Sequence, residues 1–306
     1  MIAQDKCFDC LQKQVENLCL VLKPHNASSI TQQIKDKLAQ KAAQSRTLAP
    51  PQIAIEIYQC VEQNLGISDP FIHIKQESMV RAHSICENLL VSYPAPVLER
   101  TSSGKWSVDS MRRRLDWAIR VAILGNVIDY GSQSAFSFEN ADFGFKEMIF
   151  GDFCLDALID KLECAKILFY LADNAGENIF DEVLISSLKE IYPQLQIYYA
   201  LRGKPIINDL TLEDMRHPLA KGIGHYCTLI DSGVQSPGFV YADACERAQK
   251  LYDEADVILS KGMGNFECLQ SHKDERLFML FKVKCDVVAA FCGVEKGTMM
   301  LKHNVK

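Results

Sequence analysis

Two polar clusters in the second half of the chain carry residue types that bind divalent cations. Asp173 and Asn174 directly follow the apolar stretch 165–171, which has the pattern of a buried strand. A carboxylate and a carboxamide offer two hard oxygen ligands, which suit Mg²⁺, Mn²⁺ or a similar ion. Asp209, in the pair Asn208-Asp209, offers a third oxygen from a neighbouring loop. The alternative for each cluster is a helix cap, because Asp and Asn are also common capping residues.

A third cluster, residues 261–267, reads Lys-Gly-Met-Gly-Asn-Phe-Glu and follows the apolar stretch 256–260. Glycines after a strand let backbone N–H groups face an anion, and the N-terminus of a following helix adds partial positive charge. Lys261 adds a full charge, so the segment is a candidate phosphate site. A plain glycine-rich turn is the alternative. The segment matches neither the phosphate-binding loop of nucleotide hydrolases nor the dinucleotide-binding fingerprint.

Cys7 and Cys10 form a single Cys-x-x-Cys near the start of the chain. One such pair is half a zinc site at most, and Cys285 and Cys292 are distant candidates for completing it. A redox pair, a shared metal site and packed core cysteines all stay open. Most of the twelve cysteines stand singly in apolar stretches, and we expect them to be reduced core residues of a cytoplasmic protein. Examples are Cys60, Cys86, Cys164 and Cys245.

The elements that must position these clusters divide the chain in two. Apolar residues at three- and four-residue steps predict helices over 6–22, 28–45, 50–65, 73–91 and 108–124, the last ending at Gly125. Short apolar stretches before helical patterns predict strands over 165–171, 196–201, 227–230, 256–260 and 277–281. We therefore predict an α/β protein with a helical domain over 1–150 and a largely parallel sheet domain over 151–306. The polar clusters follow the predicted strands, where ligands bind in such sheets.

Composition sets the broad class of the protein. Of its 306 residues, 48% are hydrophobic and 24% are charged, which excludes a disordered or collagen-like chain. Lys and Arg number 33 against 39 Asp and Glu, a net charge of −6, so the chain has no bulk attraction for nucleic acid or anionic membranes. No apolar run is long enough to span a bilayer. We expect a small-molecule partner, and we make no prediction of oligomeric state.

Taken together and in this order, the clusters resemble the damage-control phosphatase family, long catalogued as domain of unknown function eighty-nine. The resemblance is greatest to its microbial branch, which carries an N-terminal Cys-x-x-Cys. The matching motifs are Cys7-x-x-Cys10, Gly125-Asn126-x-x-Asp129, Asp173-Asn174-x-Gly176-Glu177, Arg202-Gly203-x-Pro205-x-x-Asn208-Asp209, Ser236-Pro237-Gly238, Ala255-Asp256, Lys261-Gly262-x-Gly264-Asn265-x-Glu267 and Lys284-Cys285.

The resemblance implies a helical domain on a Rossmann-like α/β domain and a divalent metal held by Asp173, Asn174 and Asp209. It also implies that Lys261 contacts the substrate phosphate. Family members resembling this chain act on phosphorylated sugars and related metabolites, with cobalt, nickel, manganese or magnesium. The further candidates for phosphate or substrate binding, which match motifs, are Gly262, Gly264, Asn265, Glu177 and Asn126.

The prediction is thus a metal-dependent phosphoric monoester hydrolase that uses metal-activated water, with Asp173, Asn174, Asp209 and Lys261 as catalytic residues. Two alternatives remain. A Rossmann-like sheet could bind S-adenosylmethionine and transfer a methyl group, without any need for a divalent metal. A non-enzymatic protein could hold a structural or sensing metal with the Cys-x-x-Cys and Cys285; bound zinc or iron would then fall in Cys7→Ser.

Overall fold

The computed structural model describes residues 1–44, 47–127, 145 and 148–305. The helices are α1 (Asp5–Leu22), α2 (Ala27–Gln44), α3 (Pro50–Leu65), α4 (Ile72–Ser92), α5 (Val108–Val127), α6 (Leu155–Cys164), α7 (Glu177–Ile191), α8 (Glu246–Glu254), α9 (Met263–Leu269) and α10 (Asp286–Cys292). The strands are β1 (Phe150–Phe153), β2 (Ile167–Leu171), β3 (Gln196–Leu201), β4 (Thr228–Asp231), β5 (Val257–Lys261), β6 (Leu277–Lys282) and β7 (Met299–His303). Short 3-10 turns lie at Asp214–Arg216, Pro218–Ala220, Gly222–His225 and Tyr241–Asp243.

The strands form one seven-stranded sheet in the order β1-β7-β6-β5-β2-β3-β4. Neighbouring strands are parallel except β6 and β7, which are antiparallel. The chain runs from β2 to β3 and β4 on one side and returns to β5 and β6 on the other. This reversal of strand order leaves a crevice at the carboxyl ends of β2 and β5. The predicted α/β class and the largely parallel sheet are confirmed.

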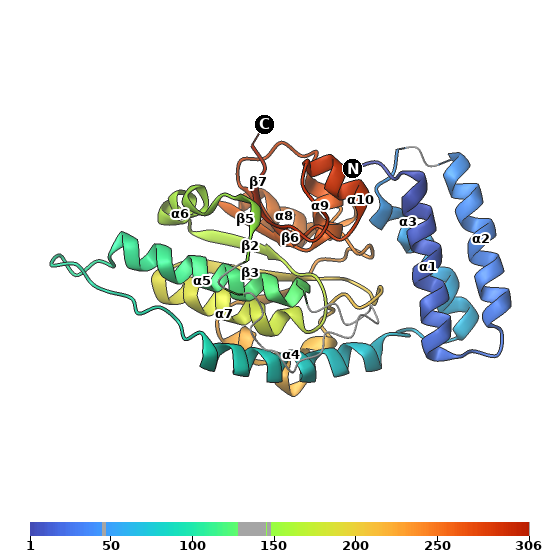
Figure 1. Cartoon of the computed structure of the whole chain (residues 1–306), viewed down its shortest axis with the longest axis horizontal. Coiled ribbons are helices and arrows are strands. Elements are labelled where there is room, and N and C mark those ends of the chain that lie inside the picture. The colour runs from blue at the N-terminus through green and yellow to red at the C-terminus, as the bar shows by residue number, and fades with distance from the viewer. Residues whose placement is uncertain (45–46, 128–144, 146–147, 306) are drawn as a thin grey trace.

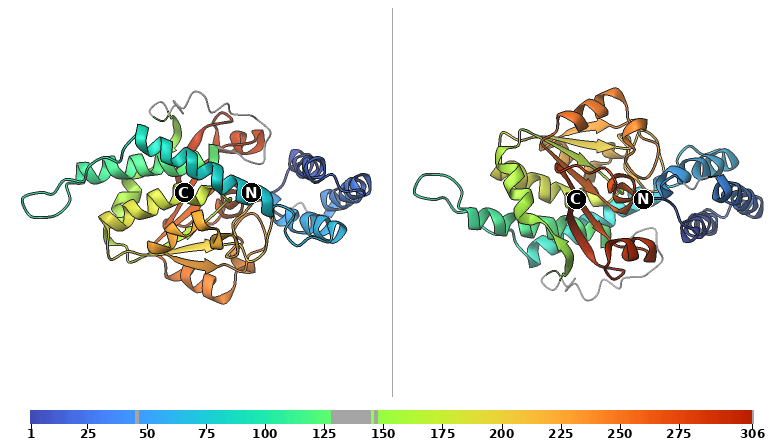
Figure 2. Two further views of the ribbon diagram at one scale, coloured as in Figure 1. Left: turned by 90° about the horizontal axis from the view of Figure 1, so that it is seen from below. Right: turned by 90° about the horizontal axis from the view of Figure 1, so that it is seen from above.

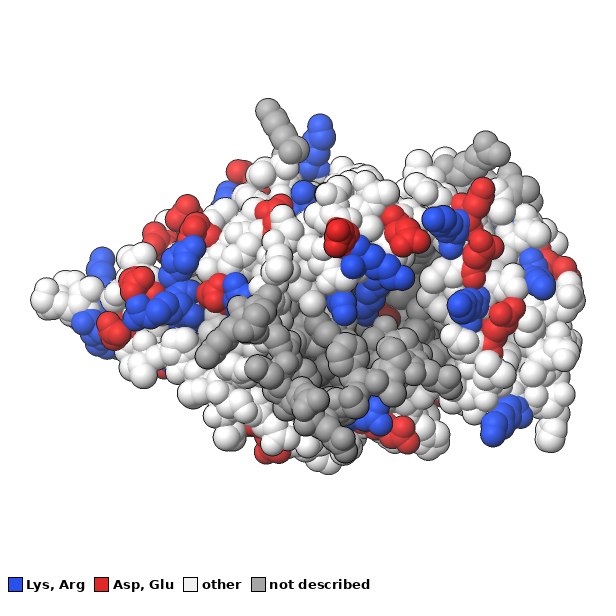
Figure 3. Space-filling model, viewed as in Figure 1, with Lys and Arg blue, Asp and Glu red and all other residues white. Residues whose placement is uncertain are grey.

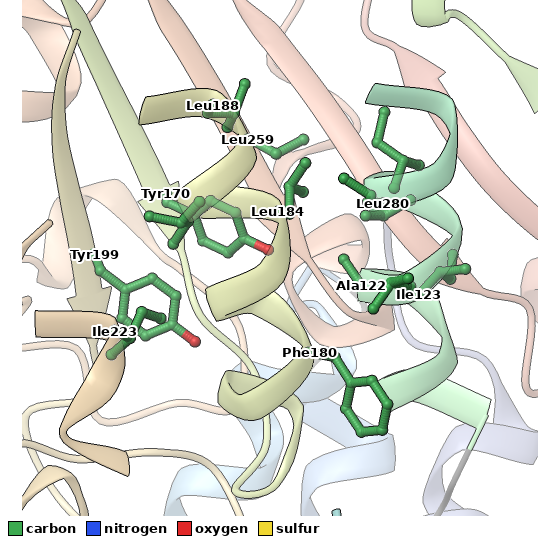
Figure 4. Packing of buried hydrophobic residues seen from close by; sticks show 14 of the residues in the cluster. Ala122, Ile123, Tyr170, Phe180, Leu184, Leu188, Tyr199, Ile223, Leu259 and Leu280 are labelled. Atoms are coloured by element: carbon green, nitrogen blue, oxygen red, sulfur yellow. The ribbon is translucent and has the colours of Figure 1, made fainter. Parts of the chain in front are cut away.

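Helices cover both faces of the sheet (Figures 1 and 2). On one face, α4, α5, α6 and α7 form a hydrophobic core with side chains of β2 and β3. Figure 4 shows Tyr170 and Tyr199 lying beside α7 in this core, with Leu184 from the helix between the strands and α5. Helices α8, α9 and α10 cover the other face. Because both faces are buried, β2 is apolar along its whole length, whereas β5 begins apolar and ends in the buried Ser260 and Lys261.

The helices before the sheet belong to two bodies. Helices α1, α2 and α3 form a bundle with its own core, which Ile206 from the loop after β3 completes. Helices α4 and α5 instead share the core of the sheet, and α5 packs along α7. The predicted boundary between residues 150 and 151 places all five helices in one domain. The hydrophobic cores instead divide the helices near residues 66–71, between α3 and α4. Helical periodicity alone does not say which partner an apolar stripe will face.

Several local features differ from the sequence-based expectations. The sequence pattern did not predict β1 and β7: β1 has four residues with mostly part-exposed side chains, and β7 ends in the part-exposed Lys302 and His303. Helix α5 continues through Gly125 to Val127, and a Cβ at Gly125 would lie 3.1 Å from the Glu177 Cα. Gly125 therefore permits close helix packing instead of ending the helix. Cys60 and Cys86 are buried, but Cys164 and Cys245 are exposed at the end of α6 and the start of α8.

Candidate active site

Two loops that leave the sheet side by side bring the predicted ligands together. The first loop follows β2 and contains Asp173 and Asn174; the second follows β3 and contains Asp209. Asn174 and Asp209 form an antiparallel backbone bridge, and the Leu210 N–H donates to the Asp173 carbonyl at 3.0 Å. The three side chains therefore share one edge of the sheet, as the sequence predicted for parallel strands.

Hydrogen bonds orient the polar side chains in this group. The Asn174 Nδ2 donates to Asp173 Oδ2 at 3.0 Å and to Glu177 Oε1 at 2.9 Å. Because the amide nitrogen faces these two carboxylates, the amide oxygen is directed away from them. Arg202 Nε donates to Asp209 Oδ2 at 2.7 Å and leaves the other carboxylate oxygen for a further partner. The group thus presents carboxylate and amide oxygens, the ligands that hard divalent cations prefer.

The site is strongly acidic for its degree of burial. Burial raises the pKa of Asp173 well above its ordinary value, and the carboxylates of Glu177 and Asp209 raise it further. Burial also raises the pKa of Asp209, although the Arg202 guanidinium opposes the shift. Close carboxylates in a low-dielectric site repel one another, and a bound cation would relieve this cost. The donor chemistry and the electrostatics therefore both fit a divalent metal.

The amide oxygen is needed to complete such a site. Among the described residues, no three Asp, Glu, His or Cys side chains are grouped closely enough to hold a metal ion. Asp173 and Asp209 supply two carboxylates, and Asn174 is the third donor. The alternative that Asp173 or Asn174 caps α7 is wrong, because the N-cap residue is Gly176 and no side chain caps that end.

Lys261 lies beneath the site and is fully buried. Its Nζ donates to Asp181 at 2.7 Å, to Glu177 at 3.1 Å and to the Ala122 carbonyl at 3.1 Å. These contacts use all three N–H bonds of the ammonium group. Burial alone would lower the pKa of Lys261, but the carboxylates of Asp181 and Glu177 outweigh it and raise the pKa. This placement differs from the predicted contact with substrate, because no N–H bond is left for a phosphate.

Glu177 connects Lys261 to the predicted ligands. One carboxylate oxygen accepts from Lys261 and from the Asn126 amide, and the other accepts from Asn174. Glu177 is 2% exposed. The chain Lys261–Glu177–Asn174 therefore sets the orientation of the amide. Both Glu177 and Asn126 lie behind the site and support it, whereas the sequence suggested that they bind substrate directly. Asp129, from the same motif as Asn126, lies outside the described residues.

The glycine-rich segment supports the site in a similar way. Gly262 packs against the Asp173 carboxylate. Asn265 is fully buried: its amide donates to the carbonyls of Ala172 and Lys261, and its oxygen accepts from Arg202 and from the Phe239 N–H. Asn265 thus ties the ends of β2 and β5 together. Of the predicted phosphate-binding residues in this segment, Gly264 lines open space.

That space is a cleft of about 1070 Å³ between the α1–α3 bundle and the carboxyl ends of the strands. Figure 3 shows the furrow between the bundle and the α/β body, with acidic and basic side chains on its rims. Asp173, Asn174 and Asp209 line the cleft from the sheet side. Other lining residues are Lys6, Gln14, Asn17, Tyr58, Glu77, Arg81, Gly264, Glu267, Lys284, Cys285 and Lys296. The cleft gives a small molecule access to the three candidate ligands.

The cysteine motif also reaches this cleft. Cys7, Cys10 and Cys285 all line it and are free thiols. Burial raises the pKa of Cys7 and of Cys10. Among the described residues, these thiols do not form a group of three arranged to hold a metal ion, so the alternative of a metal site built from the Cys-x-x-Cys and Cys285 gains no support.

Sequence reasoning missed parts of the supporting layer. Asp181 lies one turn after Glu177 on α7, and it accepts from Tyr170, Tyr199 and Lys261. The sequence did contain a signal for this role: Asp181 lies four residues after the motif residue Glu177, so both carboxylates share one face of the helix. Arg202 stood in a motif without an assigned role, and its pairing with Asp209 required the loop to fold back. Lys284 stood in another motif; it lines the same cleft, and its charge opposes the rise in the pKa of Asp173.

Comparison with known proteins finds similarity over nearly the whole chain. The family model "Damage-control phosphatase ARMT1-like domain" matches residues 3–300. A damage-control phosphatase of Pyrococcus horikoshii is 31% identical over 255 residues, covering 82% of this chain and 79% of the relative. One of Archaeoglobus fulgidus is 32% identical over 253 residues, covering 82% and 81%. The crystal structure of a DUF89 family protein from P. horikoshii superposes with a TM-score of 0.80 at 27% identity, covering 99% of both chains.

Proposed function

The chain belongs to the ARMT1-like damage-control phosphatase family, and on this premise we propose that it hydrolyses phosphate monoesters of small metabolites with the help of a divalent metal ion. The observation that carries the proposal is the convergence of Asp173, Asn174 and Asp209 at one wall of an open cleft. Among the described residues, no helix is both long and apolar enough to cross a membrane.

In this proposal Asp173, Asn174 and Asp209 hold the metal, which is Mn²⁺, Mg²⁺, Ni²⁺ or Co²⁺. When bound, the metal activates water and neutralises charge on the phosphoryl group. Arg202 orients Asp209 through its 2.7 Å hydrogen bond and opposes the rise that burial causes in the pKa of Asp209. Glu177 holds the Asn174 amide so that its oxygen faces the cleft.

We assign the phosphate contact to groups that line the cleft. Lys284 reaches the cleft from the loop after β6 and lies close enough to Asp173 to lower its pKa. Gly264 lines the cleft at the start of α9, and its Cα packs against the Pro237 backbone, where a Cβ would lie 2.0 Å from the carbonyl oxygen. Cations and backbone N–H groups around a phosphoryl group stabilise the charge that develops during transfer. Lys261 does not contact the substrate in this proposal; it supports the site by neutralising Glu177 and Asp181.

Phosphate release from a panel of sugar phosphates and other phosphorylated metabolites, with several divalent metals, tests the proposal. We expect turnover that requires a metal and is lost in Asp173→Ala, which should remain folded because its neighbours lose a repelling charge. Full activity of Asp173→Ala with added manganese would overturn the assignment. Release of phosphate from none of the esters with any metal would count equally against it.

A methyltransferase is the competing enzyme class for a sheet of this kind. The chain leaves β2 through Asp173-Asn174 and not through a glycine-rich cofactor loop, and the family match favours phosphate chemistry. A thermal-shift comparison separates the two: a methyltransferase would be stabilised by S-adenosylmethionine in the presence of a chelator, whereas the proposed phosphatase would be stabilised by Mn²⁺.

A further inference from the structure

Glu267 is a cleft-lining carboxylate that the proposed chemistry does not use. It lies on α9, is 8% exposed, and belongs to the cleft wall with Gly264. The Met1 ammonium donates to its backbone carbonyl oxygen. Among the described residues, none donates a hydrogen bond to its carboxylate or forms an ion pair with it. A buried carboxylate without a partner costs free energy, so its orientation into the cleft requires an explanation.

The surroundings of Glu267 offer weak hydrogen-bond donors. Cys7 and Cys10 from α1 line the cleft close enough to Glu267 to interact with it electrostatically, and Cys285 at the start of α10 lies near both thiols. The Lys6–Asp286 ion pair, at 3.7 Å, joins α1 to α10 beside them. Thiols are poor donors, and the Met1 ammonium, which hydrogen-bonds to the backbone carbonyl oxygen, acts on the carboxylate only as a nearby charge. A strong donor can reach it from the open side of the cleft.

The position of Glu267 relates it to the candidate metal site. Gly262 touches Asp173 and directly precedes α9, and Glu267 lies on that helix and lines the same cleft as Asp173. A phosphate ester with its phosphoryl group beside Asp173 can therefore extend its organic part along α9. The far end of a short organic group then meets the Glu267 carboxylate.

We propose that Glu267 is a specificity-determining residue that accepts a hydrogen bond from a hydroxyl or ammonium group on the organic part of the substrate. This inference rests on the proposed function, because it assumes that the phosphoryl group binds beside Asp173. A substrate donor restores the interaction that the carboxylate lost on burial. An ester without such a donor leaves the carboxylate unpaired, and sites of this kind discriminate strongly against such analogues.

Binding of three matched phosphonates to the metal-loaded protein tests the inference, because their C–P bond is not hydrolysed. Butylphosphonate has no donor, 3-hydroxypropylphosphonate ends in a hydroxyl group, and 3-aminopropylphosphonate ends in an ammonium group. By calorimetry, we expect at least one donor-bearing compound to bind about tenfold more tightly than butylphosphonate. Tighter binding of the amine alone indicates a charged donor, and tighter binding of the alcohol alone indicates a neutral one. Equal binding of all three, or no binding, overturns the inference.

Three variants assign the preference to this side chain. Glu267→Leu should bring the three affinities within about twofold of one another, because it removes the acceptor. Glu267→Gln should keep a preference for the alcohol and lose any preference for the amine. Glu254→Leu, at an exposed position of α8, should change none of the three affinities. If Glu267→Leu retains the full preference, another residue determines it. Glu267→Leu should fold, because an apolar residue replaces an unpaired buried charge.

Hydrolysis of p-nitrophenyl phosphate tests the phosphatase assignment separately, since its leaving group has no N–H or O–H donor. We expect the wild-type protein to hydrolyse this ester in the presence of Mn²⁺ and Glu254→Leu to retain the same activity. A protein that shows the phosphonate preference but hydrolyses no ester would contradict the phosphatase proposal and support the role of Glu267. A protein that hydrolyses esters without any preference would do the reverse.

Discussion

Gly262 packs so closely against Asp173 that a Cβ on the glycine would lie 1.8 Å from the Asp173 Oδ2 atom. The same glycine has a φ of +83°, in the region that other residues avoid. Two independent constraints therefore require glycine here, and one of them, the close approach, acts at the carboxylate that we assign to the metal.

Gly262→Ala should impair the metal site more than it impairs the fold. The methyl group must displace the Asp173 carboxylate. We therefore expect the apparent affinity for Mn²⁺, measured from the rise in melting temperature with metal concentration, to fall at least tenfold. Gly293→Ala is the matched control: φ is +68° there, but nothing lies within 4 Å of its Cβ. It should lose about 1–2 kcal/mol of stability from backbone strain and keep the metal response. Equal metal affinity of the two variants would argue against Asp173 as a ligand.

Replacing Lys261 by Met should mainly lower the stability of the protein, whereas replacing Lys284 by Met should mainly weaken substrate binding. Lys261→Met leaves two buried carboxylates without their cation, which we expect to cost about 3–5 kcal/mol in urea unfolding. Lys284→Met, at the cleft wall, should cost less than about 1 kcal/mol and raise the KM for phosphate esters. If Lys261→Met were as stable as wild type and specifically lost affinity for phosphate, the result would support the direct contact between Lys261 and the substrate phosphate that the sequence predicted.

Asp173→Asn should separate the stability of the fold from metal binding. Burial and the neighbouring carboxylates disfavour the charged form of Asp173, so the amide should be at least as stable as wild type in the presence of a chelator. Added Mn²⁺ should no longer raise the melting temperature. Asp160→Asn, at an exposed position of α6, should keep the full metal-dependent shift. A normal shift in Asp173→Asn would be evidence that this carboxylate does not bind the metal.

Glu267 should make the stability of the metal-free protein depend on pH. Burial raises its pKa from 4.5 to about 7, and the Met1 ammonium opposes the shift. Between these values the folded protein holds more protons than the unfolded chain, so stability falls as pH rises. The group's contribution is present below about pH 4.5 and is lost as pH passes 7, a change on the order of 3 kcal/mol.

Urea unfolding across pH 4.5 to 8 in a chelator measures this effect. Asp173 and Asp209 contribute slopes of the same sign, because their pKa values are also raised. Glu267→Gln should therefore flatten the profile in part, and the variant should be more stable than wild type at pH 8. An unchanged slope in Glu267→Gln would show that this carboxyl is not the titrating group.

Much of the architecture follows from local pattern. The predicted helix 50–65 matches α3, and the predicted strand 196–201 matches β3, because apolar periodicity and proline or glycine boundaries are short-range signals. The order of strands and helices also predicted polar residues at the carboxyl ends of a parallel sheet. That Asp173, Asn174 and Asp209 lie together is a consequence of this topology, and it required no knowledge of side-chain packing.

The sequence by itself determined the α/β class, the main elements and which polar segments share one edge of the sheet. The tertiary structure decided which side chains face the cleft and which support the site from behind. Lys261 carries a charge that suits a phosphate ligand, and it follows a strand next to glycines. In the folded protein, however, it is enclosed by α5 and α7, and it donates its hydrogen bonds to Glu177 and Asp181. Burial and charge pairing depend on residues more than eighty positions apart, and a local sequence pattern carries no information about such contacts.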